Sequence, residues 1–270
     1  CGKSTTGRLI TRLVEPTSGK IRFKGEDLLA FDSKKMRANR KDVQLVFQDP
    51  YSSLNPRKTI MQILARPLEV HGLAQGWRDK RERVLELLNL VGLGREHIDR
   101  YPHEFSGGQR QRIAIARALS VDPELIIGDE PVSALDVSVQ AQILNLFREL
   151  QEKFQLTYLF IAHDLSVVRH ISDRVSVMYV GKIVETGPVE EIFARPQHPY
   201  TKALMVAVPE PDPDKPAPTL MLSGEIATPI NPPPGCRLCK RCPIATPNCE
   251  FDPPPLEEKA PGHFVACHNI

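Results

Sequence analysis

The sequence predicts an α/β domain over residues 1–187, followed by a smaller region rich in proline and cysteine over residues 188–270. Two observations lead to this prediction. Short apolar runs alternate with stretches whose apolar residues recur at helical spacing, which is typical of strands and helices layered around one core. Proline and cysteine are unevenly distributed, because 18 of the 25 prolines lie at Pro188 or later and five of the six cysteines lie from Cys236 to Cys267.

The overall composition is that of a folded globular chain. Of its 270 residues, 41% are hydrophobic and 25% are charged, and the formal net charge is +2. This balance gives no support to a general nucleic-acid binder, which usually carries a strong basic excess. No apolar run approaches the roughly 20 residues that cross a bilayer, so any role at a membrane requires partner subunits. The chain opens inside a motif, at Cys1-Gly2-Lys3, and we expect that a segment precedes it.

The order of secondary structure follows from the apolar pattern. Four apolar runs predict buried strands, and they are residues 43–47, 125–127, 156–162 and 174–180. Apolar residues at helical spacing predict helices, which are residues 79–90, 106–119 and 138–153. From Asp49 to Tyr101 no strand pattern is present, so we expect an inserted helical subdomain over about residues 50–120. Because proline interrupts helices and central strands, we expect residues 188–270 to form an extended appendage closed by its cysteines.

The first residues contain the end of a phosphate-binding loop. Gly2-Lys3-Ser4-Thr5 matches the last part of the pattern Gly-x-x-x-x-Gly-Lys-Ser/Thr, whose first glycine is absent here. In such a loop, backbone N–H groups and a helix N-terminus converge on phosphate oxygens. Lys3 would reach the outer phosphates and Ser4 would hold Mg²⁺. Considered alone, the fragment is equally well explained as a chance Gly-Lys-Ser sequence in a loop.

Polar side chains follow three of the predicted strands. Asp129 and Glu130 follow the second strand, where Asp suits a Mg²⁺-bound water and Glu suits a base that positions water. His163 follows the third strand and is placed to donate a hydrogen bond to a γ-phosphate. Gln48 follows the first strand and is placed to contact Mg²⁺ or the attacking water. The alternatives are solvated acids, a turn histidine bonded to backbone, and a glutamine without a role.

A glycine-rich turn opens one predicted helix. The sequence Phe105-Ser106-Gly107-Gly108-Gln109 leads into the helix that ends near Leu119, and such a helix N-terminus makes a second anion-binding site. Since the loop at Gly2 already serves the phosphates held by this chain, the second site indicates a nucleotide held by another chain. The alternative is a helix cap with flexible glycines.

Taken in order, these elements resemble the ATP-binding cassette (ABC) ATPase family, and the resemblance covers residues 1–187. The family implies a P-loop NTPase fold, which is an α/β core with an inserted helical subdomain. It also implies ATP hydrolysis, with two such domains closed head to tail around two ATP molecules. The motifs that carry the resemblance are Gly2-Lys3-Ser4-Thr5, Gln48, Ser106-Gly107-Gly108-Gln109, Asp129-Glu130, Ser133-Ala134-Leu135-Asp136 and His163.

The resemblance implies a role for each motif residue in the chain's own nucleotide site. Asp129 orders Mg²⁺ and its water, and Glu130 is the general base. His163 is the switch residue on the γ-phosphate, while Gln48 senses that phosphate, joins the Mg²⁺ ligands and faces the membrane subunits. The residues that bind ATP and Mg²⁺ through the phosphate loop are Gly2, Lys3, Ser4 and Thr5.

Other motif residues are implied to face a second ATPase subunit, identical or paralogous. Asp136 would organise the seam between the two subunits. The residues that would sit on the partner's ATP are Ser106, Gly107, Gly108 and Gln109.

Longer stretches resemble the ATPases of oligopeptide and dipeptide permeases, namely residues 47–57, 161–168 and 197–204. This resemblance implies a subunit that powers peptide import across the bacterial inner membrane, bound peripherally at its cytoplasmic face. Its other partners would be two transmembrane permease subunits and, indirectly, an extracytoplasmic substrate-binding protein, without any nucleic acid. The alternatives are a related importer of nickel or glutathione-like cargo, an exporter half, and an ABC ATPase that acts without a membrane partner.

The cysteines of the last third are too dense for chance and leave three interpretations open. Cys-x-x-Cys-x-x-Cys resembles part of a ferredoxin-type run, four thiolates suffice for structural Zn²⁺, and disulfides are disfavoured in a cytosolic chain. Peptide-permease ATPases have a similar tail with four cysteines, which implies a [4Fe-4S] cluster here. Cys239 departs from that tail, and the matching residues are Cys236, Cys242, Cys249 and Cys267.

Overall fold

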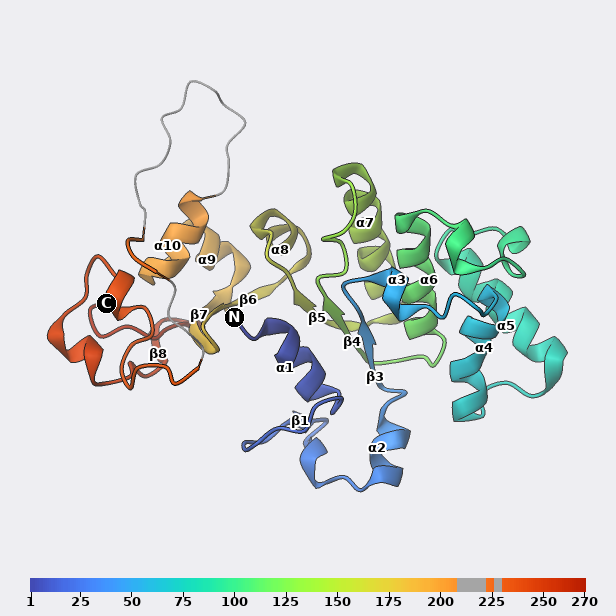
Figure 1. The fold of residues 1–270 in the computed structure, drawn as a ribbon, viewed down its shortest axis with the longest axis horizontal. Helices are drawn as coiled ribbons and strands as arrows, with labels where there is room; N and C mark the ends of the chain where they lie inside the picture. Colours follow the sequence, from blue (N-terminus) through green and yellow to red (C-terminus); the bar gives the residue numbers. More distant parts are fainter. Residues whose placement is uncertain (208–221, 226–229) are drawn as a thin grey trace. The chain divides into compact units, whose positions relative to one another are not determined.

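The structure, a computed structural model, describes residues 1–207, 222–225 and 230–270 (Figure 1). Its contacts fall into two units. The N-terminal unit comprises Ser4–His163, and the C-terminal unit comprises Cys1–Lys3 together with Asp164–Ile270. No helix in the described part of the chain combines the length and apolar character needed to span a bilayer.

A three-stranded parallel sheet forms the centre of the N-terminal unit. Its strands lie in the order β3 (Val43–Val46), β4 (Leu125–Asp129) and β5 (Thr157–Ile161). Ile127 in the central strand pairs with Leu45 on one side and Leu159 on the other. Parallel strands covered on both faces read as continuous apolar runs, which is why the sequence predicted them. The three strands expected near these positions are confirmed.

Helices cover both faces of this sheet. Helix α1 (Lys3–Ile10) packs on one face through Gly7, where an added Cβ would lie 3.3 Å from Ile127 and 3.3 Å from Ile161. Helix α7 (Val137–Phe154) packs on the other face, where the ring of Phe147 meets two aromatic rings of β5 edge-on. The N-terminal unit therefore has the layered α/β architecture that the sequence predicted.

The segment between β3 and β4 is helical. It holds α3 (Pro50–Ser53), α4 (Ile60–His71), α5 (Gly76–Leu90) and α6 (Gly107–Leu119). Helix α4 begins at a capping box made by Thr59 and Gln62 and ends at Gly72, whose φ of 66° closes the helix in the left-handed region. The helices predicted over 79–90, 106–119 and 138–153 correspond to α5, α6 and α7 and are confirmed.

Several short elements carry too little periodicity for the sequence to reveal. They include the hairpin β1 (Arg22–Phe23) and β2 (Glu26–Asp27), and helix α2 (Ser33–Asn39), which begins where the Asp32 side chain accepts a hydrogen bond from the Lys35 N–H at 2.7 Å. Single turns of 3-10 helix lie at Leu28–Ala30, Arg95–His97, Pro102–Glu104, Cys239–Arg241 and Pro247–Glu250.

An antiparallel sheet forms the centre of the C-terminal unit. Its order is β6 (Arg174–Tyr179), β7 (Lys182–Pro188), β9 (His263–Val265) and β8 (Glu257–Ala260). Strand β6 confirms the fourth predicted strand. The other elements are helices α8 (Leu165–Ile171), α9 (Val189–Ala194) and α10 (Pro199–Val206).

The expectation of extended chain after residue 187 is wrong for the segments that form α9, α10 and β9, while residues 208–221 and 226–229 lie outside the described residues. Helix α10 has a proline at its first position, where the missing N–H has no intrahelical partner in any case, and α9 begins directly after Pro188. Strand β9 lies between β7 and β8, and Pro261 falls in the turn between β8 and β9, outside both strands. Proline therefore starts the helices of this region instead of preventing them. Strand β7 also crosses the predicted domain boundary at 187, and that boundary stays a prediction.

Candidate nucleotide site

Three of the predicted site residues meet at one carboxylate oxygen. Glu130 Oε2 lies 3.0 Å from Gln48 Nε2, which donates a hydrogen bond to it, and 3.0 Å from His163 Nδ1. The side chain of Glu130 is 16% exposed, whereas that of His163 is 62% exposed. A shielded carboxylate thus lies behind a histidine that solvent or a ligand can reach.

Parallel strands explain why residues so far apart in sequence come together. Gln48, Glu130 and His163 follow the carboxyl ends of β3, β4 and β5, and the carboxyl ends of parallel strands lie at one edge of the sheet. Ligands of open α/β sheets bind at this edge. The three side chains that the sequence predicted at strand ends are therefore neighbours.

Glu130 reaches its position through an uncommon backbone conformation. Its φ is 49°, in the left-handed region that costs a non-glycine residue roughly 1–3 kcal/mol. Its N–H donates to Ile161 O at 2.9 Å, and its carbonyl accepts from both the N–H and the hydroxyl of Ser133. The local turn therefore holds a conformation that the chain would otherwise avoid.

Asp129 has a different environment from its neighbour. It is 3% exposed, and its Oδ1 has no hydrogen-bond partner among the described residues. Because side chains alternate along a strand, Asp129 shares with Ile127 the sheet face that α1 covers. A buried carboxylate oxygen without a partner fits a hard cation, and Mg²⁺ prefers such oxygen ligands.

The phosphate-loop residues lie at the start of α1. Gly2 has a φ of 97° and precedes the helix, while Lys3, Ser4 and Thr5 form its first turn. The first turn of a helix carries N–H groups without intrahelical partners, which is the arrangement that binds phosphate. Gly2 and Lys3 are assigned to the C-terminal unit, and Ser4 and Thr5 to the N-terminal unit.

The glycine-rich turn caps α6 as the sequence predicted. The Ser106 hydroxyl accepts from the Gln109 N–H at 3.3 Å, and the Gln109 side chain accepts from the Ser106 N–H at 3.0 Å. An added Cβ at Gly108 would lie 2.4 Å from Val139 Cγ1 of α7, so only glycine fits there without a shift. The glycines therefore allow the first turn of α6 to pack closely against α7.

Asp136 lies at the start of α7, close to this turn. It occupies the N-cap position of α7 and makes no side-chain capping hydrogen bond. An added Cβ at Gly107 would contact Leu135 at 3.4 Å, so the residue before Asp136 is a direct neighbour of the glycine-rich turn. The structure thus brings together the two segments that the sequence analysis expected to face a second subunit.

One contact in the segment after Gln48 was not predicted from the sequence. Arg110 lies over the ring of Tyr51, 4.7 Å from its centroid, and its Nε donates to Pro102 O at 2.8 Å. Tyr51 is 58% exposed and belongs to the segment after Gln48. The cation–π contact links that segment to the helix that follows the glycine-rich turn. The sequence signal for it was an aromatic residue, Tyr51, three positions after Gln48.

The cysteines of the C-terminal unit have the donor chemistry for a metal but not the arrangement. None of the six, all of which are described, forms a disulfide. Among residues 1–207, 222–225 and 230–270, no group of three or more His, Cys, Asp or Glu side chains is placed to hold a metal ion. Burial, together with neighbouring thiols, raises the pKa of Cys236 and Cys242. The cysteines thus match an iron–sulfur cluster or zinc in the type of their donor atoms, but the described residues do not place them around a metal ion.

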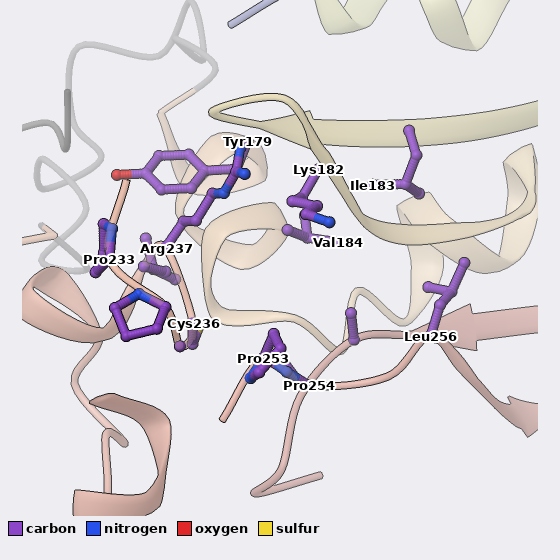
Figure 2. A pocket seen from close by; sticks show the side chains of 14 residues that line it. Tyr179, Lys182, Ile183, Val184, Pro233, Cys236, Arg237, Pro253, Pro254 and Leu256 are labelled. Carbon is purple, nitrogen blue, oxygen red and sulfur yellow. The ribbon is translucent and has the colours of Figure 1, made fainter. Parts of the chain in front are cut away.

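A separate cavity lies in the C-terminal unit. Its volume is about 370 Å³, at the small end of ligand sites, which span roughly 300–1,000 Å³. Figure 2 shows that its lining includes Tyr179, Lys182, Cys236, Arg237 and Pro254. The described residues that line it include none of the predicted nucleotide ligands. It is therefore distinct from the candidate nucleotide site.

Comparisons with known families match both parts of the chain. The profile of a family described as "ABC transporter" matches residues 1–133. The profile described as "Oligopeptide/dipeptide transporter, C-terminal region" matches residues 184–249. The two matched segments do not overlap and follow one another in the order of the two predicted regions.

Similar proteins and structures extend this result. The oligopeptide transport ATP-binding protein AppF of Bacillus subtilis is 55% identical over 271 residues, covering 99% of this chain and 82% of AppF. The dipeptide transport ATP-binding protein DppF of Haemophilus influenzae is 52% identical over 270 residues, covering 100% of this chain and 82% of DppF.

Solved structures show the same cassette. The dimeric, post-hydrolysis structure of the ATP-binding cassette MJ0796 with ADP and Pi matches with a TM-score of 0.63 and 30% identity, covering 70% of this chain and 81% of that one. CbiO1 from Clostridium perfringens, part of the ABC transporter complex CbiONQ, matches with a TM-score of 0.64 and 29% identity, covering 72% and 75%.

Proposed function

The chain belongs to the ABC transporter family of ATP-binding proteins, in the branch that serves oligopeptide and dipeptide import, and on this premise we propose how its residues divide the work. It is an ATPase that uses ATP and Mg²⁺ and energises peptide import. We propose that its ATPase domain spans residues 1–187 and its peptide-permease-type region residues 188–270.

The meeting of Gln48 and His163 at Glu130 Oε2 carries the proposal. Glu130 is the general base. Both contacts are made to Oε2, so the other carboxylate oxygen, Oε1, is the one that accepts a proton from the attacking water. Gln48 orients that water and joins the Mg²⁺ ligands. Both contacts fix the rotamer of the base before water arrives, which lowers the reorganisation needed in the transition state.

His163 binds the γ-phosphate through its other ring nitrogen. Nδ1 of His163 lies 3.0 Å from Glu130 Oε2, so Nε2 is the ring nitrogen left to face the phosphate. A polar contact at that position would help to hold the γ-phosphate beside the base. His163 therefore couples the presence of the γ-phosphate to the placement of the base.

Asp129, Gln48 and Ser4 are the groups that would hold Mg²⁺. The metal ion neutralises charge that develops on the β- and γ-phosphate oxygens when it is bound. The unpartnered Oδ1 of Asp129 provides a carboxylate oxygen for the ion or its water. The phosphates themselves would lie on the first turn of α1, with Gly2, Lys3, Ser4 and Thr5.

A second ATPase subunit, identical or paralogous, completes the site. The first turn of α6 presents N–H groups of Gly107 and Gly108, which suit the outer phosphates of a nucleotide held by the opposite subunit. Ser106 and Gln109 fix this turn, and Asp136 lies at the seam beside it. Two nucleotides thus join the two subunits, and hydrolysis removes the contacts that hold them together.

The chain's other partners follow from peptide import. We propose two transmembrane permease subunits as direct partners at the cytoplasmic face of the inner membrane, and an extracytoplasmic substrate-binding protein as an indirect one. Purification under mild detergent is expected to recover the chain with two multi-spanning proteins and a second ATPase. Recovery with ribosomes or DNA would instead support an ABC ATPase without a membrane partner.

Replacing the base tests the catalytic assignment. Glu130→Gln keeps the size of the side chain but removes the proton acceptor, so single-turnover hydrolysis is expected to fall by 10²-fold or more. The affinity for ATP is expected to stay within about twofold, since general-base catalysis acts in the transition state. The matched control is Glu149→Gln on the exposed face of α7. Hydrolysis at the rate of the unaltered protein in Glu130→Gln would rule out this assignment.

We further propose that Cys236, Cys242, Cys249 and Cys267 take a metal centre, a [4Fe-4S] cluster with zinc as the alternative. Their soft thiolate donors suit either metal, and the hydrogen bond from Cys236 N–H to Cys249 O at 2.8 Å joins two of their segments. No step of ATP hydrolysis passes through this group. Anaerobic purification with absorption spectroscopy and metal analysis distinguishes a coloured, iron-loaded protein from a colourless, zinc-loaded one, and a metal-free protein would refute both.

A further inference from the structure

The backbone conformation of Glu130 is stabilised by contacts other than those among the side chains of Gln48, Glu130 and His163. Its φ of 49° ends β4 abruptly, although Glu has a Cβ and the left-handed region favours glycine. In a continuing strand, Asp129 and Glu130 would point to opposite faces of the sheet. The left-handed turn redirects the side chain of Glu130, whose Oε2 then meets Gln48 and His163.

Hydrogen bonds hold the backbone of Glu130 on both sides of its Cα, at its N–H and at its carbonyl oxygen. Its N–H continues the parallel ladder by donating to Ile161 O at 2.9 Å. Its carbonyl oxygen accepts twice from Ser133, from the N–H at 3.2 Å and from the hydroxyl at 3.0 Å. Pro131 lies at the second position of this turn, where its fixed φ suits the chain reversal.

The close packing of the turn leaves little room for another conformation. An added Cβ at Gly128 would lie 3.1 Å from Pro131 Cγ, so the proline lies directly against β4. Val132 is 4% exposed. Ser133 is half-buried, and its hydroxyl proton points inward to Glu130 O instead of outward to a ligand.

We propose that Ser133 is a positioning residue for ATP hydrolysis, whose hydroxyl holds the backbone of Glu130 in the left-handed conformation that aims the base. The inference rests on the proposed role of Glu130 and adds a residue that acts through the backbone of Glu130. Loss of the hydroxyl releases one of two hydrogen bonds to the Glu130 carbonyl and lets the residue relax toward extended backbone. The base then spends less time in the orientation that activates water.

The test compares two substitutions at this position in the full-length protein within its assembled transporter. Ser133→Ala removes the hydroxyl and keeps the backbone N–H bond, so kcat is expected to fall roughly tenfold while the dissociation constant for ATP is unchanged. Ser133→Thr keeps a hydroxyl on the same carbon and is expected to restore kcat to within about twofold. Ser33→Ala, at an exposed serine of α2, is the matched control. Thermal unfolding of each variant verifies that it is folded.

Each outcome decides the inference. A fall in kcat alone, reversed by threonine, supports the positioning role. An unchanged kcat in Ser133→Ala overturns it, as does a parallel change in kcat and ATP affinity that threonine does not reverse, because that pattern marks a contact with nucleotide. If Glu130→Gln retains hydrolysis, the proposed base is wrong. If Glu130→Gln is inactive while Ser133→Ala is fully active, only the role of Ser133 fails.

Discussion

At the scale of single residues, two neighbouring carboxylates acquire different chemistry from different surroundings. Glu130 accepts hydrogen bonds from Gln48 and His163 at one oxygen, which fixes its direction and suits a base. Asp129 is 3% exposed and keeps Oδ1 without a partner among the described residues, which suits a bound cation. The difference comes from the turn at residue 130, because a regular strand would have carried both side chains onward in alternation.

The cation assignment of Asp129 predicts a specific magnesium dependence. Asp129→Asn keeps the shape of the side chain but removes its charge, so the Mg²⁺ concentration at half-maximal ATP hydrolysis is expected to rise by roughly tenfold or more. A titration of ATPase activity with Mg²⁺ measures this shift. Asp99→Asn, which removes a surface partner of Arg81 at 3.6 Å, is expected to leave the curve in place. The same response in both variants would contradict the assignment.

His198 predicts acid sensitivity of the C-terminal unit. Burial lowers the pKa of His198 to about 4, against a raising effect of Glu185. The imidazole is therefore neutral in the folded state, with Nδ1 accepting from the Tyr200 N–H at 3.1 Å. Since the unfolded chain, with a pKa near 6.5, binds more protons between about pH 4 and 6.5, stability is complete above that window and falls by about 3 kcal/mol as pH drops through it.

His198→Asn separates this effect from other titrations. Asparagine is a good N-cap that does not titrate in this window, so the variant is expected to lose much of the acid-dependent fall in the free energy of unfolding. Chemical denaturation of both proteins at pH 7 and at pH 4.5 gives the comparison. Parallel pH profiles for the two proteins would show that another group controls the sensitivity.

At the scale of elements, a buried carboxylate joins three segments of the C-terminal unit. Glu185 of β7 is fully buried and accepts from the N–H groups of Gln197 and His198 at 2.7 and 3.1 Å. Its Oε1 also lies 2.7 Å from Nε2 of His263 in β9. One side chain thus connects the strand at the predicted domain boundary, the turn before α10 and the strand near the chain's last residues.

Removing the charge of Glu185 is expected to loosen these elements together. Glu185→Gln replaces one acceptor oxygen with an amide N–H₂ that faces donors, and breaking such a buried pair typically costs about 3–5 kcal/mol. Hydrogen exchange is expected to show lost protection in β9 and the first turn of α10. Glu257→Gln on exposed β8 is the control, since its partner Lys259 lies at the surface. Equal protection in both variants would show that the carboxylate does not connect the segments.

The elements also show what a single sequence reveals. Strand β4 was predictable because burial on both faces demands continuous apolar residues, and β3 and β5 were predictable because they too are largely apolar runs. Strands β8 and β9 were not, because residues 257–260 are largely exposed and β9 has only three residues. Strand β9 pairs with β7, which is distant in sequence, and β8 joins the sheet only through β9. Proline was misread as a breaker, although α10 uses Pro199 as its first residue.

The same limit applies to the site. The polar residues after each strand were identifiable from order and motif, and parallel pairing explains why Gln48, Glu130 and His163 meet. The left-handed backbone conformation of Glu130 could not be predicted from the sequence. The residues Asp-Glu-Pro do not specify it, and it depends on the turn that Ser133 closes by its hydrogen bond to Glu130 O. The residue types therefore predicted which groups take part, whereas hydrogen bonds formed in the folded chain determine how the Glu130 side chain is oriented.

At the scale of the whole molecule, we propose that the chain presents half of each of two sites. In this proposal the base, the cation ligand and the phosphate loop belong to one nucleotide, whereas the capped turn at Ser106 and the neighbouring Asp136 serve another. This division explains why the turn is built by a capping box and by glycines packed against α7, far along the sequence from the phosphate loop. The proposal therefore requires two subunits for either site to be complete.

The most direct measurement is a structure of the assembled transporter carrying Glu130→Gln and trapped with ATP and Mg²⁺. We expect the N–H groups of Gly107 and Gly108, in the Ser106–Gln109 turn of one subunit, to lie about 3 Å from the γ-phosphate of ATP held by the opposite subunit. A trapped, ATP-loaded pair in which this turn faces solvent, away from any phosphate, would contradict the account.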